Sequence, residues 1–150
     1  MELKTFKKMI NDTFTINGFS KKGSYYYSYN DDLIFAIGLQ KSNYSNSYYI
    51  NIGIIVKKLN PDLQNPRDVD GDIRARFDFE NDGKYLDCFE LQQFNEVDNE
   101  KINRYLQDNI NIYVKSVTSL DKLKLLLKSK PVMLYQTTSR ARDFLGFPPG

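Results

Sequence analysis

Two alternating apolar runs separated by a short polar break constrain the fold of this chain more than any other feature. The runs are LIFAIGLQK at 33–41 and YYINIGIIVK at 48–57, and the break at 42–47 reads SNYSNS. Alternation with a period of two is typical of half-buried strands, and β-branched side chains are favoured on their pleated surface. The segment 33–57 is therefore predicted to form a β-hairpin around which the rest of the chain is organised.

The alternation also limits how the two strands of this hairpin pair. A shift by one residue would move one aliphatic row to the opposite face, so opposed residue numbers must add up to an odd value. A four-residue loop at 44–47 meets this condition and places Gly38 opposite Gly53. Glycines opposed in this way leave space for a ligand or for another part of the backbone.

Two interpretations of that space are open. Tyr25, Tyr27 and Tyr29 alternate in a preceding strand, and a tight turn at 30–32 places them on the same face as Gly38. Aromatic rings packed over strand glycines are a known arrangement, and we favour it here. The alternative is an open ligand groove with the following lining: Gly38, Gln40, Asn51, Gly53, Tyr25 and Tyr27.

The remaining patterns predict a single α+β domain over 1–150. An amphipathic helix is expected from about Leu3 to a stop at Gly18, and a second hairpin is expected to turn at Asp82-Gly83. Helical periodicity then predicts C-terminal helices at 102–117, 120–127 and 139–145. The expected fold is a mainly antiparallel sheet of about five strands built from hairpins, packed by the N-terminal helix and the C-terminal helices.

The residue types present exclude several kinds of site. The chain has no histidine, which removes the commonest general base and metal ligand, and the single Cys88 rules out an intramolecular disulfide. Asp68, Asp70 and Asp72 have calcium-loop spacing, but the sixth position is Ile73 and the twelfth is Phe79, where a calcium loop needs glycine and glutamate. We expect no catalytic set, no metal and no cofactor.

The N-terminus and the hydropathy predict a cytoplasmic protein. MELKTFKKMI lacks the apolar core and cleavage site of a secretory signal. No apolar run approaches the roughly 20 residues that a membrane span needs. The abundance of Asn, Lys, Tyr and Ile suggests an AT-rich coding genome and a bacterial source.

Charge is unevenly distributed along the chain. Residues 60–100 contain twelve acidic and four basic residues, so this segment is near −8 while the remainder is near +10. Such a segment could meet a protein partner with a basic surface, although a solvated loop explains it as well. In the segment 72–80, polar side chains are expected to alternate outward. The partner-binding candidates are Asp68, Asp70, Asp72, Arg74, Arg76 and Asp78.

Several short motifs resemble a bacterial family known as a domain of unknown function, DUF4304. The similarity extends roughly from Leu3 to Val117, and it implies an α+β fold without an established activity or catalytic residues. The matching motifs are Gly18-Phe19, Lys21-Lys22-Gly23, an aromatic near Tyr26, Gln40-Lys41-Ser42 and Tyr49-Ile50-Asn51-Ile52-Gly53.

Three functions are compatible with these observations. The first is a non-enzymatic protein-binding module, of the kind that neutralises a toxin. The second is nucleic-acid binding, in which tyrosines stack on bases beside Lys21, Lys22 and Lys41. The third, an enzyme acting through carboxylates and arginines in 72–78, ranks last because that row has no base or metal set beside it. The sequence alone leaves the oligomeric state open.

Overall fold

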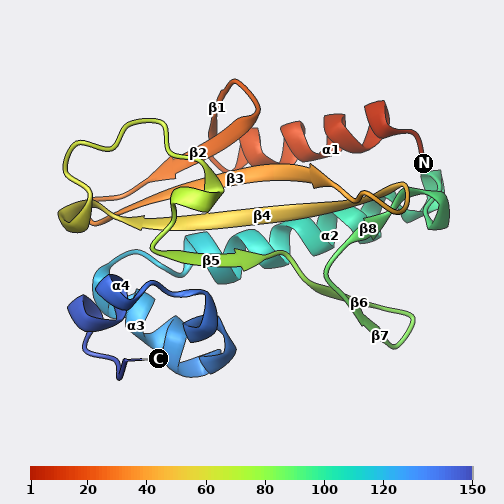
Figure 1. Ribbon diagram of the computed structural model, residues 1–150. Coiled ribbons are helices and arrows are strands. Elements are labelled where there is room, and N and C mark those ends of the chain that lie inside the picture. The colour runs from red at the N-terminus through yellow and green to blue at the C-terminus, as the bar shows by residue number, and fades with distance from the viewer. Residues whose placement is uncertain (150) are drawn as a thin grey trace.

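The computed structural model describes residues 1–149, and Figure 1 shows the arrangement of their helices and strands. Elements labelled η are 3-10 helices, except η5, which is a π-helix. In chain order the elements are α1 (Leu3–Ile16), β1 (Ser20–Lys22), β2 (Tyr25–Tyr29), β3 (Leu33–Lys41), β4 (Ser47–Val56), η1 (Lys57–Leu59), η2 (Asp68–Asp70), β5 (Ile73–Arg76), β6 (Phe79–Asn81), β7 (Lys84–Leu86), β8 (Phe89–Glu90), η3 (Leu91–Gln93), η4 (Glu96–Asp98), α2 (Asn99–Ile110), η5 (Asn111–Lys115), α3 (Leu120–Ser129), η6 (Pro131–Gln136) and α4 (Ser139–Leu145).

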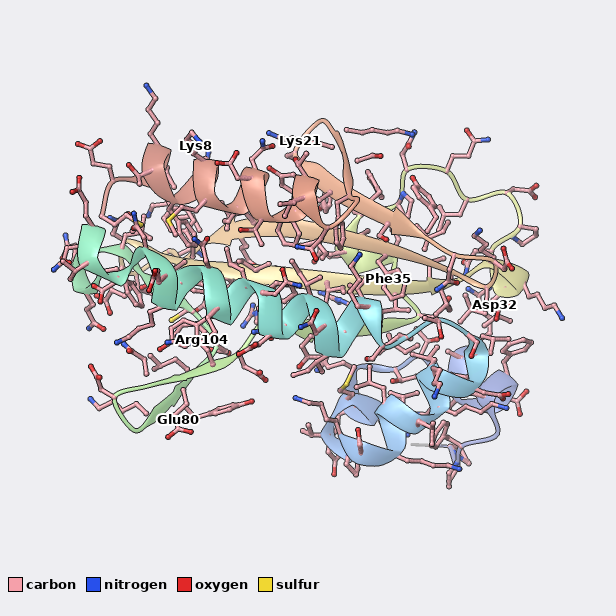
Figure 2. The ribbon with its side chains drawn as sticks, turned by 180° about the vertical axis from the view of Figure 1, so that it is seen from behind. Lys8, Lys21, Asp32, Phe35, Glu80 and Arg104 are labelled. Carbon is pink, nitrogen blue, oxygen red and sulfur yellow. The ribbon has the colours of Figure 1, made fainter. Side chains whose placement is uncertain are left out.

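The predicted α+β class is confirmed. Strands β1 to β5 follow one another in a six-stranded sheet, in which the sixth strand, β8, also pairs with β4. All of these pairings are antiparallel, and β6 with β7 forms a separate two-stranded hairpin. Helices α1 and α2 lie side by side across one face of the sheet, which we call the inner face (Figures 1 and 2).

None of the helices in residues 1–149 has the length and apolarity that crossing a bilayer requires.

The central hairpin forms as predicted, but its register differs by two residues. Ile37 pairs with Ile52, and Gly38 lies opposite Asn51 and not opposite Gly53. The loop still has four residues, at 43–46, but it closes one residue earlier because the backbone N–H of Ser42 donates to the carbonyl of Ser47 at 2.8 Å. The required parity is kept, so both aliphatic rows face the helices.

The inner face carries the main hydrophobic core. On α1, Phe6, Ile10 and Phe14 are spaced by one helical turn and are all buried against the sheet. From α2, Ile102 and Leu106 enter the same core, and both are fully buried. Complete burial of each such side chain contributes about 1.5–3 kcal/mol to folding, so this face fixes the positions of the two helices.

An aromatic ring and a backbone segment fill the glycine positions on the opposite, outer face. The predicted tyrosine packing is confirmed at Gly38, where a β-carbon would lie 2.7 Å from a ring carbon of Tyr25. At Gly53 that prediction is wrong, because the carbonyl oxygen of Asp68 would lie 2.3 Å from an added β-carbon. Gly71 approaches the same strand closely enough that its own β-carbon would lie 2.7 Å from the α-carbon of Gly53. The outer face is therefore partly covered by the loop that carries η2.

The second hairpin and the C-terminal helices also match their predicted positions. Asn81 pairs with Lys84, and the loop residues Asp82 and Gly83 both have positive φ, at 50° and 79°. The helical stripe predicted for 102–117 is divided between α2 and η5, and the last predicted helix is α4, which ends at Gly146 with φ of 81°. Between β5 and β6 the buried Asn109 holds the backbone of Asp78. Its side-chain oxygen accepts from the N–H of Asp78, and its side-chain nitrogen donates to the carbonyl of Asp78.

Candidate binding groove

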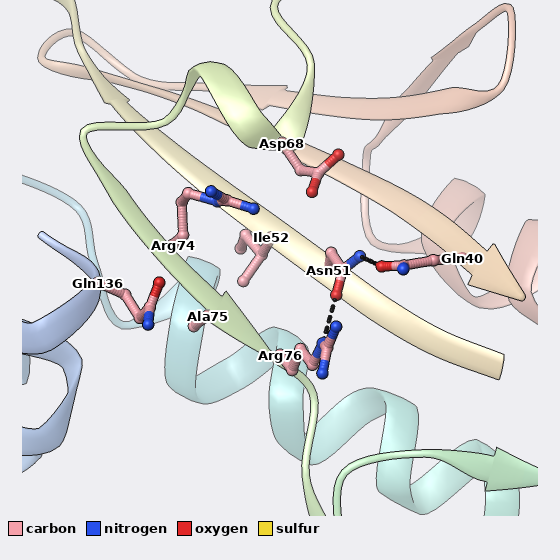
Figure 3. Close-up of a pocket in the computed structure, with 8 residues that line it drawn as sticks. All are labelled: Gln40, Asn51, Ile52, Asp68, Arg74, Ala75, Arg76 and Gln136. Atoms are coloured by element: carbon pink, nitrogen blue, oxygen red, sulfur yellow. Dashed lines mark hydrogen bonds between the residues drawn. The ribbon is translucent and has the colours of Figure 1, made fainter. Parts of the chain in front are cut away.

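A polar groove opens on the outer face of the sheet, between β4, β5 and η2 (Figure 3). It has a volume of about 370 Å³, and an adjoining hollow of about 480 Å³ extends it towards β2 and β3. We call the two together the outer groove. They share five lining residues: Gln40, Asn51, Asp68, Arg74 and Arg76.

Arg76 is held in place by a chain of side chains along the groove floor. Its Nε donates to Oδ1 of Asn51 at 2.9 Å, and the Nδ2 of Asn51 donates to Oε1 of Gln40 at 2.7 Å (Figure 3). Its guanidinium also lies 4.0 Å from the ring centroid of Tyr49, which is a favourable cation–π distance. Asp87 lies 3.9 Å away on the other side. Arg76 is thus oriented before any ligand arrives.

Arg74, unlike Arg76, has a guanidinium without side-chain partners in residues 1–149. It is exposed, and within residues 1–149 its guanidinium forms neither an ion pair nor a hydrogen bond. The side chain extends over the groove towards η2 (Figure 3). A guanidinium has five N–H donors in a planar fork, so Arg74 offers a complete set of donors to an acceptor that enters the groove.

Asp68 forms the wall of the groove opposite Arg74. Its side chain comes from η2, is 8% exposed, and accepts a hydrogen bond from the hydroxyl of Tyr25 at 2.9 Å. Burial, together with this bond to Asp68, raises the pKa of Tyr25 to about 12. Tyr25 therefore remains a neutral donor at physiological pH, and the pair closes the end of the groove above Gly38.

The structure brings together residues from both predicted candidate sets. Asp68, Arg74 and Arg76 were expected on a partner-binding segment, whereas Gly38, Gln40, Asn51 and Tyr25 were expected in an alternative groove. All seven line the outer groove. They meet because β5 pairs with β4 while the η2 loop folds back over the same strand.

The other predicted residues lie elsewhere. Tyr27 is buried, and its hydroxyl donates to the carbonyl of Pro66 at 2.7 Å. Gly53 is covered by the backbone of Asp68. The tyrosine stacking surface proposed for nucleic acid is therefore reduced, because Tyr25 and Tyr27 are both engaged within the fold.

The outward position expected for Asp72 is wrong. Asp72 is 2% exposed, and its carboxylate accepts hydrogen bonds from the backbone N–H of Val56 and the amide of Asn60, both at 2.8 Å, and from Arg140 at 3.2 Å. The alternation pattern does not apply to Asp72 because this residue precedes β5. It lies beside the end of β4, where the backbone N–H of Val56 requires a hydrogen-bond acceptor. It is a structural carboxylate.

Asp70 and Asp78 also lie outside the groove. Asp70 accepts a hydrogen bond from the backbone N–H of Arg67 at 2.8 Å, and that bond lowers the pKa of its carboxyl. Asp78 is half-buried on the other side of β5, where its carboxylate lies 3.9 Å from Lys130. Because the aspartates face different partners, the described chain, residues 1–149, contains no cluster of three groups able to hold a metal.

Five of the exposed acidic side chains lie in residues 80–100, after β5. Figure 1 shows the β6–β7 hairpin projecting away from the sheet, and Tyr85 on it is 68% exposed. Asp87 joins this region to the outer groove through its position 3.9 Å from Arg76. We call these exposed carboxylates the acidic arm: Glu80, Asp82, Asp87, Glu96 and Glu100.

Sequence reasoning missed two residues that shape the groove. Gln136 reaches it from η6, and Tyr49 supports Arg76 from β4. For Tyr49, the aromatic-plus-arginine pairing across neighbouring strands was a usable signal once the register was known. For Gln136 no local signal exists, since it lies 60 residues along the chain from Arg76, which lines the same groove.

Comparison with known protein families gives a match over most of the chain. The model of the family described as a domain of unknown function, DUF4304, matches residues 10–120. No curated protein and no solved structure gives a significant match. The matched range includes every residue of the outer groove except Gln136.

Proposed function

This chain belongs to the DUF4304 family of domains of unknown function, and we propose that it is a non-enzymatic protein-binding module of the toxin-immunity kind. The observation that carries the proposal is the outer groove, in which Arg76 is held by Asn51 while Arg74 has no side-chain partner among residues 1–149. Arginine and tyrosine are enriched among the residues that dominate binding energy at interfaces. A groove whose side chains are already ordered loses less entropy when a partner docks.

The acidic arm suggests the charge of that partner. Glu80 and Asp82 lie on the projecting β6–β7 hairpin, and Asp87 follows it beside the groove. Glu96 and Glu100 lie on η4 and at the start of α2. Complementary charge of this kind mainly raises the association rate and the specificity of a complex. We therefore propose a partner with a basic surface that also presents a carboxylate or a backbone carbonyl to Arg74.

The contents of the groove favour binding over catalysis. Its lining contains one carboxylate, Asp68, and that group is already hydrogen-bonded to Tyr25. General acid–base catalysis works best with groups whose pKa lies near the operating pH, whereas the pKa of Tyr25 is raised to about 12. Two arginines and three amides suit recognition of an acceptor group better than proton transfer.

Site-specific photo-crosslinking in the source cell tests the proposal. A benzophenone amino acid is placed at Gln136, which is exposed and lines the groove. In a control protein it is placed at Arg104, which is exposed on α2, on the helix side of the sheet (Figure 2). We expect one protein to be crosslinked from position 136 and not from position 104. Identical crosslinks from both positions would contradict a docking site at the groove.

A titration with the captured protein then measures the contribution of Arg74. Arg74→Ala is expected to weaken binding about tenfold or more, as removal of an interface arginine commonly does, while Arg104→Ala leaves the Kd within about twofold. Unchanged binding by Arg74→Ala would remove the groove from the interface. Turnover of the partner by the wild-type protein would contradict the non-enzymatic assignment.

A further inference from the structure

A second hollow, of about 630 Å³, lies on the inner face between α1 and the ends of β2, β3 and β4. Two of its lining residues, Ser24 and Leu39, also border the outer groove, but the hollow itself lies against α1 on the other side of the sheet. Its size falls within the range of about 300–1,000 Å³ that is usual for small-molecule sites. Neither the family nor the proposed protein-binding function assigns a role to it.

The floor of this hollow is apolar. Leu39 of β3 is only half-buried, although it belongs to the aliphatic row that faces the core. The hydroxyl of Tyr26 is satisfied within the fold, since it donates to Oδ1 of Asn11 at 2.9 Å. The floor therefore offers apolar contact area in which the Tyr26 hydroxyl is already paired. Its members are Leu3, Ile10, Tyr26, Leu39 and Tyr48.

Lysines surround the floor. Lys7 and Lys8 come from α1, Lys21 comes from β1, and Lys41 comes from the end of β3. Lys8 and Lys21 lie along the same edge of the molecule (Figure 2). Of these four lysines, Lys8 alone has a carboxylate partner within residues 1–149, Asp12 at 2.6 Å. The other three ammonium groups around the hollow have none.

The contacts of these three lysines leave their charge available. Lys21 lies 5.6 Å from the ring centroid of Tyr26, which keeps it at the mouth of the hollow. Lys41 donates only to the carbonyls of Ser42 and Ser45, at 3.2 and 3.4 Å. An ammonium group is a compact point charge on a flexible stem, so it suits a small anionic head group.

We propose that this hollow binds a soluble single-chain amphipathic anion, such as a medium-chain fatty acid. The apolar body would lie on Leu39 and Tyr26, and the anionic head would lie among Lys7, Lys21 and Lys41. Burial of an apolar chain is favourable by about 25 cal/mol per Å², and the surrounding positive charge selects the sign of the head group.

Three probes separate the two parts of the recognition. Decanoate carries both an apolar chain and an anionic head, butyrate keeps the head with a short chain, and decyltrimethylammonium keeps the chain with a positive head. We expect calorimetry to detect saturable binding of decanoate, and at least tenfold weaker binding of both other probes. Equal binding of decanoate and decyltrimethylammonium, or no binding of decanoate below its micellar concentration, would overturn the proposal.

Variants and mapping locate the site. The combined variant Lys7→Gln, Lys21→Gln, Lys41→Gln is expected to bind decanoate about tenfold more weakly, because each exposed charge contributes modestly. The matched control Lys58→Gln, Lys84→Gln, Lys128→Gln removes three exposed lysines elsewhere and keeps wild-type affinity. In NMR spectra of the wild-type protein, the methyl signals of Ile10 and Leu39 should shift on titration. Shifts confined to Leu125, in the exposed groove between η5 and α3, would place binding elsewhere and refute the assignment.

Discussion

The carbonyl oxygen of Asp68 lies directly over Gly53, so close that a β-carbon at residue 53 would be 2.3 Å from it. Gly53→Ala is therefore expected to lower the free energy of unfolding by about 3 kcal/mol, because the obstacle is backbone that cannot rotate away. Gly38→Ala is the matched comparison, since its obstacle is the ring of Tyr25 at 2.7 Å. That half-buried ring can move, and we expect a loss of about 1 kcal/mol. Urea denaturation of both variants gives the comparison, and equal losses would contradict it.

Two aspartates of the calcium-like triplet should differ sharply in their effect on stability. Asp72→Ala leaves the buried N–H of Val56 without its acceptor and separates Arg140 from its carboxylate, so we expect a loss of about 3–4 kcal/mol. Asp70→Ala removes a partly exposed carboxylate paired with Arg67, and we expect a loss below about 1 kcal/mol. Thermal and urea unfolding measure both. Similar values for the two variants would show that Asp72 is not the acceptor we describe.

Alkaline pH should weaken the fold partly through Tyr25. Its pKa is raised from 10.0 to about 12 by burial and by Asp68. Between these values the unfolded chain releases the phenolic proton first, so the free energy of unfolding falls as pH rises from 10 to 12. Tyr25→Phe should show a shallower fall over that window than the wild type, measured by urea denaturation at each pH. An identical slope would mean that Tyr25 titrates alike in both states.

The acidic arm should act on the rate at which the crosslinked partner associates. Glu80→Lys combined with Asp82→Lys is expected to slow association about tenfold at low ionic strength and much less at high salt, with a small effect on dissociation. The control for net charge is Asp121→Lys combined with Asp143→Lys, which reverses two exposed acidic residues on α3 and α4. Stopped-flow or surface-based kinetics distinguish the two rates. An equal effect of this control would reduce the arm to a general charge effect.

The sequence predicted what local periodicity determines. The alternation of apolar residues predicted that Ile37 and Ile52 lie on the same face of the sheet. The Asp82-Gly83 turn was predicted from residue types that tolerate positive φ. Parity survived the error in register because the loop kept an even number of residues. The absolute register did not follow, since moving the loop by one residue on each strand satisfies the same alternation. It was decided by the bond between Ser42 and Ser47.

The site was harder to predict because its parts are joined only by tertiary structure. The polar character of Arg74, Arg76 and Gln40 was visible in the sequence, but nothing local indicated that η2 would fold back onto Gly53. The same fold-back removed Asp72 from the surface and brought Asp68 to the groove wall. The spacing of Asp68 and Asp72 in the sequence suggested one shared acidic face, but in the structure the two side chains lie in different surroundings.

Two of the outer strands of the main sheet, β1 and β5, have a consequence for how the protein behaves at high concentration. Strand β1 has three residues and strand β5 has four, and each carries two basic side chains. Short strands with like charges are poor templates for the backbone of another molecule. The long aliphatic strands β3 and β4, which would aggregate readily if exposed, are enclosed between these basic borders, so the chain can maintain a strongly β-forming centre while resisting edge-to-edge polymerisation.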